Sequence, residues 1–262
     1  MTTDPQAGRG PHPFSGVPGP EFPVPDALTR GLGHGTFEVV WLNEVGGVTV
    51  RSEAGGRPVY AKWAPAGTEL DLAAEADRLA WAAPYAAVPE VVDFVSGDDG
   101  DVLITAALPG GNAVTPRWRS EPEVAVHALG EGLRALHEAL PVESCPYSWS
   151  AHVRIARSRA DGIPERVAVL DRLAPAPEPD RLVVCHGDAC APNTLLAEDG
   201  TVTGHVDLGR LGVADRWADI AVGAWSTEWN YGPGFTGLYY EAYGVDPDEE
   251  RIAYYRALWD AT

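Results

Sequence analysis

Two stretches decide how this chain folds: HGDACAPN at residues 186–193 and VDLGR at residues 206–210. In the first stretch, Asp188 and Asn193 stand five positions apart. Short apolar runs between the two stretches flank the turn sequence EDG, a combination that predicts a β-hairpin. The second stretch then places Asp207 at the end of a strand. The tripeptide HGD alone can arise by chance, whereas the full order of loop, hairpin, strand and Asp is far more specific.

These polar residues have the spacing of the protein-kinase catalytic loop, H-R-D-x-x-x-x-N. In that loop the Asp accepts the proton of the substrate hydroxyl and the Asn holds a magnesium ion, while an Asp further along is the second metal carboxylate. The pattern therefore predicts Asp188 as the catalytic residue, and Asn193 and Asp207 as Mg²⁺ ligands. Gly187 stands where kinases have Arg.

Lys62 is the only lysine in a chain that has eighteen arginines. A compact ammonium on a flexible stem suits a phosphate site in a way that the planar guanidinium of Arg does not. Lys62 lies in the β-rich run PVYAKW, the context of the phosphate-binding lysine of kinases. Glu75, thirteen residues on, lies in an Ala- and Leu-rich stretch that predicts a helix, and it is the expected ion-pair partner of Lys62. The alternative for Lys62 is a solvated strand lysine.

Composition narrows the class of protein. A chain of 262 residues forms one or two domains, and a 45% hydrophobic content supports a sizeable core. No apolar run approaches the roughly 18 residues that span a bilayer, and no signal-peptide pattern is visible, so we expect a cytoplasmic protein without a membrane partner. The three cysteines have no metal-binding spacing and are expected to be reduced. The net charge of −19 argues against nucleic acid and suits a polycationic ligand, although acidity for solubility alone is an equally simple explanation.

Three parts follow from the pattern of turns and periodicity. Residues 1–27 are rich in Pro and Gly and predict a flexible tail. Residues 28–107 predict a small β-rich N-lobe that binds nucleotide, and residues 108–262 a mainly helical C-lobe for catalysis and substrate binding. The expected strands are 37–41, 47–51, 59–62, 91–95 and 102–106. The expected helices are the one around Glu75 and those at 124–140, 154–160, 165–173, 214–225, 238–243 and 249–259.

The chain resembles the aminoglycoside phosphotransferases over nearly its whole length after the tail. The matching motifs are YAKWAP (60–65), EADRL (75–79), LPG (108–110), LRALH (133–137), CP (145–146), VVCHGD (183–188) and VDLGRLGVADR (206–216), of which the last two are highly specific. The resemblance implies an α+β, bilobal protein-kinase-like fold. It implies transfer of the γ-phosphate of ATP, with Mg²⁺, to a hydroxyl of an aminoglycoside antibiotic. We expect a monomer that binds this small molecule and no nucleic acid.

The same resemblance assigns residues to the nucleotide. Gly46 and Gly47 would let the backbone approach the phosphates closely, and the linker from Thr105 to Ala107 would meet the adenine. The chain departs from the family here, because its loop at residues 43–48, NEVGGV, is short and lacks the usual Ser. Whether a side chain of this loop contacts phosphate is therefore left open.

Two branches of the family look similar to this chain: the 3′-kinases of kanamycin and neomycin, and the 3″-kinases of streptomycin. The Pro192-Asn193 ending, the Asp207-Leu208-Gly209 order and the segment Glu228-Trp229-Asn230 favour the streptomycin branch. The final five residues point the same way, because they carry one acidic side chain where the 3′ branch has an acidic pair with aromatics.

The resemblance implies that the C-terminal region walls the substrate pocket. Glu228 and Asp260 are the carboxylates predicted to contact a cationic substrate, and Trp229 and Trp259 are the predicted stacking rings. A solvated surface acid is the alternative interpretation of both carboxylates. Four further polar residues of the motifs are predicted to be structural. His186 is one, and Arg210, Asp215 and Asp219 are expected to form ion pairs behind the metal loop.

Two other kinds of function stay open. The chain could phosphorylate another small hydroxyl compound, such as a different antibiotic, choline or a sugar, with unchanged ATP motifs. It could also be a non-catalytic pseudokinase, although a binding module need not retain Asp188, Asn193, Asp207 and Lys62 together.

Overall fold

The computed structural model describes residues 16, 22–33, 36–43 and 45–262. They form two compact units, one with residues up to 80 together with 89–107, the other with residues 81–88 and 108–262. The flexible tail predicted for residues 1–27 lies mostly outside the described residues. Within its described part, Gly16 and Leu42 exchange backbone hydrogen bonds of 2.9 and 3.0 Å, and helix α1 begins at Asp26.

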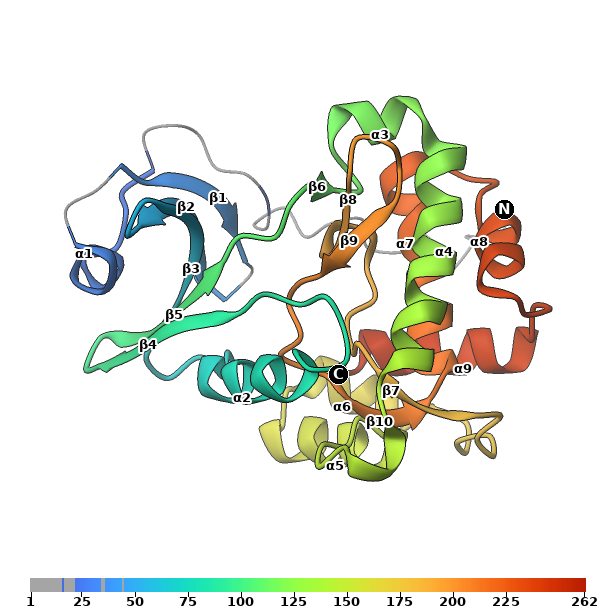
Figure 1. Cartoon of the computed structure of the whole chain (residues 1–262). Coiled ribbons are helices and arrows are strands. Elements are labelled where there is room, and N and C mark those ends of the chain that lie inside the picture. Colours follow the sequence, from blue (N-terminus) through green and yellow to red (C-terminus); the bar gives the residue numbers. More distant parts are fainter. Residues whose placement is uncertain (1–15, 17–21, 34–35, 44) are drawn as a thin grey trace, which may run out of the picture. The chain divides into compact units, whose positions relative to one another are not determined.

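The first unit is built on an antiparallel sheet with the strand order β1-β2-β3-β5-β4. Alternating Val and Ala residues face one side of the sheet, where Val50 and Ala61 are fully buried against Leu28 of α1. Figure 1 shows α1 lying against these strands. The elements are α1 (Asp26–Leu32), β1 (Glu38–Leu42), β2 (Val48–Ala54), β3 (Arg57–Pro65), α2 (Leu72–Ala82), β4 (Val91–Gly97) and β5 (Gly100–Ala106).

The opposite side of this sheet carries Lys62, which is predicted to bind nucleotide phosphate. Lys62 is paired with Thr49 of β2 and Leu103 of β5. Since directly paired residues of an antiparallel ladder share a face and neighbours along a strand alternate, Lys62 lies on the side away from Ala61 and α1.

The second unit is mainly helical. Its helices are α3 (Pro116–Ser120), α4 (Pro122–Ala139), α5 (Ala151–Asp161), α6 (Pro164–Leu170), α7 (Trp217–Tyr231), α8 (Thr236–Tyr243) and α9 (Glu249–Asp260), with short 3₁₀ turns η1 (Val142–Ser144) and η2 (Ala191–Asn193). Its strands are β6 (Gly111–Asn112), β7 (Leu182–Cys185), β8 (Thr194–Leu196), β9 (Val202–His205) and β10 (Gly212–Asp215). They make a small sheet β6-β8-β9 and a pair β10-β7.

Close helix packing forms the core of this unit. α7 is buried along most of its length, as its apolar sequence requires, and α4 runs beside it in Figure 1. α4 meets α8 at Gly130, where an added Cβ would stand 2.7 Å from both Ala242 Cβ and Tyr239 O. The backbones of these two helices can approach so closely only because position 130 has no side chain.

The prediction of a helix over 214–225 is wrong at its start. Ala214 and Asp215 belong to β10, which pairs with β7, a strand about thirty residues earlier in the sequence. Helix α7 begins only at Trp217. The fold-class prediction is confirmed: the chain is α+β, with an antiparallel sheet in one unit and a largely helical second unit. Within the described residues, no helix combines the length and the apolar character that crossing a bilayer demands.

Candidate active site

A buried carboxylate holds the backbone of the loop that contains Asp188. Asp219 of α7 is 1% exposed, and its oxygens accept hydrogen bonds from the amides of His186 (2.5 Å) and Gly187 (3.0 Å). His137 of α4 places its Nε2 3.0 Å from the same carboxylate. Burial raises the pKa of Asp219, but the hydrogen bond and charge of His137 and the backbone bonds outweigh it and leave the pKa below its usual value. Asp219 is therefore an ionised anchor for this loop.

The ring of His186 joins the catalytic loop to the segment before Asp207. Its Nδ1 accepts a hydrogen bond from the Asp188 amide at 3.2 Å, and its Nε2 lies 3.0 Å from the carbonyl oxygen of Val206. An amide can only donate and a carbonyl can only accept, so the ring is neutral with its proton on Nε2. This supports the predicted structural role of His186, since both ring nitrogens are already used.

Gly187 has to be glycine in this loop. Its φ is +88°, and an added Cβ would stand 2.3 Å from the backbone oxygen of Arg210. Both the left-handed backbone and the close approach exclude a side chain. The loop therefore has Gly where kinases have Arg, because the chain at Arg210 occupies the space that a side chain would need.

Asp188 is set up as an acceptor. Its Oδ1 is buried and has no hydrogen-bond partner in the described part of the chain. A buried carboxylate oxygen without a donor is costly, and a substrate hydroxyl would satisfy it. The nearby Cys190 thiol has a pKa raised well above its usual value by burial and by the charge of Asp188, so it stays protonated.

The two predicted metal ligands lie on adjoining segments. The side-chain amide of Asn193 donates from Nδ2 to the carbonyl oxygen of Asp188 at 3.0 Å, which leaves Oδ1 as the atom for a cation. The Val206 amide donates to the carbonyl oxygen of Asn193 at 2.9 Å, directly before Asp207. Asp207 is exposed and has a φ of +65°, the one non-glycine residue with positive φ among those the structure describes. Such strain often accompanies function.

In the first unit, Lys62 and Glu75 form the predicted ion pair. Lys62 Nζ lies 2.6 Å from Glu75 Oε1, and the Glu75 side chain is 7% exposed. β3 supplies the lysine and α2 the glutamate, so the pair fixes the ammonium on the polar face of the sheet.

The other predicted nucleotide residues lie at the two ends of β3. Thr105 is paired with Tyr60, and the Ala107 amide donates to the Pro58 carbonyl at 3.0 Å, near the start of the strand. Gly46 and Gly47 lie in the loop between β1 and β2, near the end of β3, where an added Cβ on Gly46 would be 3.7 Å from Pro65.

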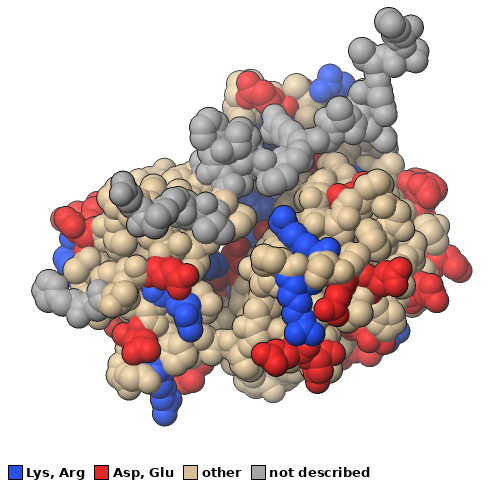
Figure 2. Space-filling view, turned by 90° about the horizontal axis from the view of Figure 1, so that it is seen from above, with Lys and Arg blue, Asp and Glu red and all other residues tan. Residues whose placement is uncertain are grey.

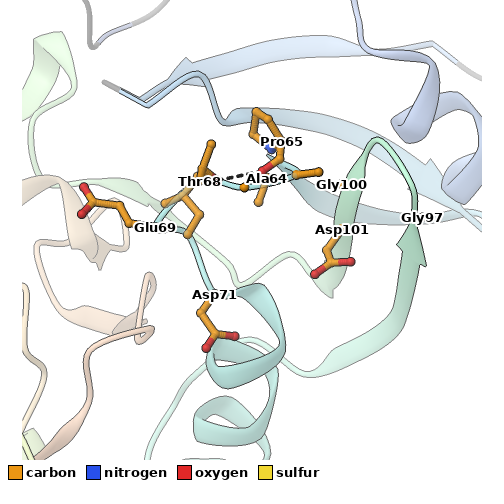
Figure 3. Close-up of a pocket in the computed structure, with 11 residues that line it drawn as sticks. Ala64, Pro65, Thr68, Glu69, Asp71, Gly97, Gly100 and Asp101 are labelled. Carbon is orange, nitrogen blue, oxygen red and sulfur yellow. Dashed lines mark hydrogen bonds between the residues drawn. The ribbon is translucent and has the colours of Figure 1, made fainter. Parts of the chain in front are cut away.

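A hollow of about 480 Å³ lies beside the end of β3, and Figure 3 shows its lining. Its carboxylates do not converge, because Glu69 points away from Asp101 in this view. Asp71 accepts a hydrogen bond from the Ala74 amide at 2.8 Å, and Asp101 accepts one from Ser96. Neither Lys62 nor Glu75 lines this hollow, and its acidic wall is unsuited to phosphate.

The predicted substrate residues lie on α7 and α9. Glu228 and Asp260 are exposed. Trp229 packs against Trp225 with ring centroids 4.7 Å apart. Trp259 is contacted by Arg210, whose guanidinium carbon lies 5.6 Å from the ring centroid.

Several contacts of this region had no local signal in the sequence. Arg210 lies at 5.6 Å from the ring of Trp149 as well, so its observed role is cation–π stacking rather than the predicted ion pair. Asp215 does form the predicted ion pair, with Arg251 at 3.2 Å. Ser226 accepts a hydrogen bond from the Ala191 amide at 2.9 Å and so holds the turn before Asn193. The sequence singles out neither Trp149 nor Ser226, because both act through long-range contacts.

One face of the molecule shows how some of its acidic side chains are distributed. Figure 2 shows acidic side chains spread over the visible face rather than gathered in one patch. The net charge of −19 therefore acts on a distant cation as a broad attractive field.

Comparisons with known proteins agree with this geometry. The model of the phosphotransferase enzyme family matches residues 45–255. An aminoglycoside 3′-phosphotransferase of Streptomyces fradiae is 38% identical, over 88% of this chain and 97% of that protein. A streptomycin 3″-kinase of Streptomyces griseus is 35% identical, over 94% of this chain and 98% of that protein. The solved structure of APH(3″)-Id from Streptomyces rimosus with ADP and streptomycin superposes with a TM-score of 0.73 at 31% identity, covering 90% of this chain and 96% of that one.

Proposed function

The chain belongs to the phosphotransferase enzyme family, and from that premise we propose that it inactivates an aminoglycoside antibiotic by transferring the γ-phosphate of ATP to one of its hydroxyls. The observation that carries this proposal is the catalytic loop. Asp219 and His186 hold it by three hydrogen bonds to its backbone amides, and Asp188 presents an unpaired, buried carboxylate oxygen.

Phosphoryl transfer needs positioning and neutralisation of charge more than covalent help from the protein. Asp188 orients the substrate hydroxyl and accepts its proton as the oxygen bonds to the γ-phosphorus. The bond from that phosphorus to the bridging oxygen breaks, and ADP leaves. Lys62, held by Glu75 at 2.6 Å, neutralises charge on the α- and β-phosphates. The linker from Thr105 to Ala107 would meet the adenine.

The residues present fit a magnesium ion. Asn193 and Asp207 offer one neutral and one anionic oxygen, the ligand type that Mg²⁺ prefers, and the hydrogen bond from Asn193 Nδ2 leaves its Oδ1 for the metal. When bound, the ion would offset the charge of the transferring phosphate. The role of the protein is to hold both oxygens on adjoining segments, which the bond between Val206 and Asn193 does.

Streptomycin, phosphorylated at its 3″-hydroxyl, is the first candidate substrate. The motif endings Pro192-Asn193 and Asp207-Leu208-Gly209 support it, and so does the small number of carboxylates near Trp259. Guanidinium groups can pair with Glu228 or Asp260 in a bidentate way and stack on Trp229. The second candidate is a 3′-phosphotransferase of kanamycin and neomycin, favoured by the 38% identity to the S. fradiae enzyme.

A coupled assay of ADP release, run with purified protein, Mg·ATP and a panel of aminoglycosides, tests the proposal. We expect turnover with streptomycin, little with kanamycin, and survival on streptomycin of cells that express the chain. Survival on kanamycin and neomycin with death on streptomycin would assign the chain to the 3′ branch. ADP release with no aminoglycoside of the panel, together with intact Mg·ATP binding, would refute the antibiotic as substrate.

A further inference from the structure

The loop between β1 and β2 uses its own backbone amides internally. Asn43 Oδ1 accepts hydrogen bonds from the amides of Val45 (3.2 Å) and Gly47 (2.7 Å), and the Gly46 amide donates to the Asn43 carbonyl at 3.2 Å. In kinase-like enzymes a loop at this place covers the phosphates. In this chain the amides of residues 45–47 are already engaged, so among the loop residues that the structure describes a further donor to a phosphate has to be a side chain.

Asn43 has such a donor in a fixed orientation. Because Oδ1 accepts two amide protons, the other end of the carboxamide is necessarily the NH₂ group. Among the described residues no hydrogen bond from Asn43 Nδ2 is formed, although the residue is only partly exposed. The two bonds to Oδ1 therefore aim an unused donor.

Strand geometry tells which side of the sheet this donor occupies. Gly47 directly precedes β2, and its carbonyl accepts a hydrogen bond from the Asn43 amide at 3.0 Å, which extends the pairing of β1 and β2 by one step. Gly47 lies two residues before Thr49, and Thr49 is the direct partner of Lys62. Residues two apart on a strand, and direct partners across an antiparallel ladder, share a face. An ideal Cβ on Gly47 would stand 2.5 Å from Asn43 Nδ2. The same Cβ would stand 2.6 Å from Leu70 Cδ1, so the NH₂ group of Asn43 and the Leu70 side chain together fill the side-chain space of Gly47, on the same face as Lys62.

Position along β3 tells which phosphate it would reach. The predicted adenine contacts, Thr105 and Ala107, lie beside Tyr60 and Pro58 at the start of the strand. Lys62 lies further along, and the Gly46 turn adjoins Pro65 at the end. Two residues of strand extend roughly 7 Å, so Asn43 lies beyond Lys62 as seen from the adenine end.

On the basis of the proposed function, we propose that Asn43 is a nucleotide-binding residue whose Nδ2 donates a hydrogen bond to the terminal phosphates of ATP. It supplies the polar side chain that the loop lacks through the absence of Ser. Its Oδ1 holds the turn and its Nδ2 binds the ligand, and Gly47 is required because any side chain there would displace the carboxamide.

The variant N43D separates the two halves of this role. Asp keeps an oxygen for the Val45 and Gly47 amides, so the turn is preserved, but it replaces the NH₂ donor by an anionic oxygen that repels phosphate. N43A removes both. The matched control is N112D, because Asn112 Oδ1 also accepts a hydrogen bond within a turn, from the Val114 amide at 3.2 Å, and the change adds the same charge.

The measurement is calorimetric binding of Mg·ATP, ADP and AMP to the full chain, with the thermal midpoint of each nucleotide-free variant as the folding check. We expect N43A to weaken Mg·ATP binding about tenfold, N43D to weaken it more than N43A, and AMP binding to change little in either. N112D should bind like the wild type.

Two results would overturn the inference while leaving the proposed function intact. One is wild-type Mg·ATP affinity in N43D, which would make Asn43 a turn anchor alone. The other is an equal loss for AMP and ATP, which would mean a general distortion. A wild-type chain that binds no Mg·ATP would instead overturn the proposed function and this inference with it.

Discussion

Replacing Gly187 by Ala tests the geometry of the catalytic loop most directly. The residue has a φ of +88°, and forcing Ala into a left-handed conformation costs roughly 1–2 kcal/mol. The added Cβ would stand 2.3 Å from Arg210 O and 2.5 Å from Arg210 C, both backbone atoms. To restore an ordinary contact, one of the two segments has to move by about 1 Å.

That displacement falls on the residue next to Asp188. Overpacking of a buried contact adds about 1–3 kcal/mol, so G187A should lose roughly 2–5 kcal/mol of unfolding free energy. A misplacement of about 1 Å at a catalytic group can reduce the rate by about a hundredfold. We expect kcat to fall by at least tenfold, with the affinity for Mg·ATP changed much less.

G162A is the matched control. Gly162 ends α5 with a φ of +67°, and an added Cβ there would find its nearest neighbour, Ala160 O, at 4.0 Å. The G162A variant should lose about 1 kcal/mol of unfolding free energy, measured by urea denaturation, and keep the wild-type kcat. If G187A and G162A lose the same stability and both retain full turnover, the close approach of Arg210 does not constrain the catalytic loop and our explanation of Gly187 is incorrect.

Three further outcomes are expected. D188N should keep the fold and Mg·ATP binding but lose about 10²–10⁴-fold in turnover, and a near wild-type rate would remove Asp188 from catalysis. K62R should raise the KM for ATP, because a planar guanidinium cannot replace an ammonium 2.6 Å from Glu75; a kinetically silent K62A would refute the phosphate role. Burial lowers the pKa of His205 to about 3, whereas the unfolded value is about 6.5. The unfolded chain then binds the extra proton between these pH values, so stability falls as pH falls through that window, and H205Q should flatten the urea-unfolding profile between pH 7 and 5. An unchanged slope in H205Q would mean that other groups govern acid unfolding.

Local sequence patterns predicted most elements because those elements form from neighbouring residues. The alternation around Lys62 gives β3, and the apolar period from Val124 gives α4. The sequence patterns did not predict the strand at Gly212–Asp215, because this strand is stabilised by pairing with Leu182–Cys185 and Ala214 itself favours a helix. The sequence patterns did not predict helix α1 either, because Pro and Gly dominate the residues before it.

The motifs point to candidate reactive residues but not to the groups that hold them. Asp188 and Asn193 are recognisable by their spacing alone. The spacing says nothing of Asp219 binding two loop amides, or of Ser226 holding Ala191, because those contacts bridge more than thirty residues. In the same way, the dual use of the Asn43 carboxamide depends on a turn whose hydrogen bonds no sequence pattern specifies.

The two hydrogen bonds of the His186 ring limit which residues can replace it. One nitrogen has to accept and the other has to donate, so a substitute needs a donor and an acceptor on two separate atoms. Besides neutral His, the uncharged side chains with this arrangement are the carboxamides of Asn and Gln, because a hydroxyl has both abilities on one oxygen. The ring thereby links the backbone at Asp188 to the backbone just before Asp207. We expect a substitution at residue 186 to shift the proposed proton acceptor and the proposed metal ligand together.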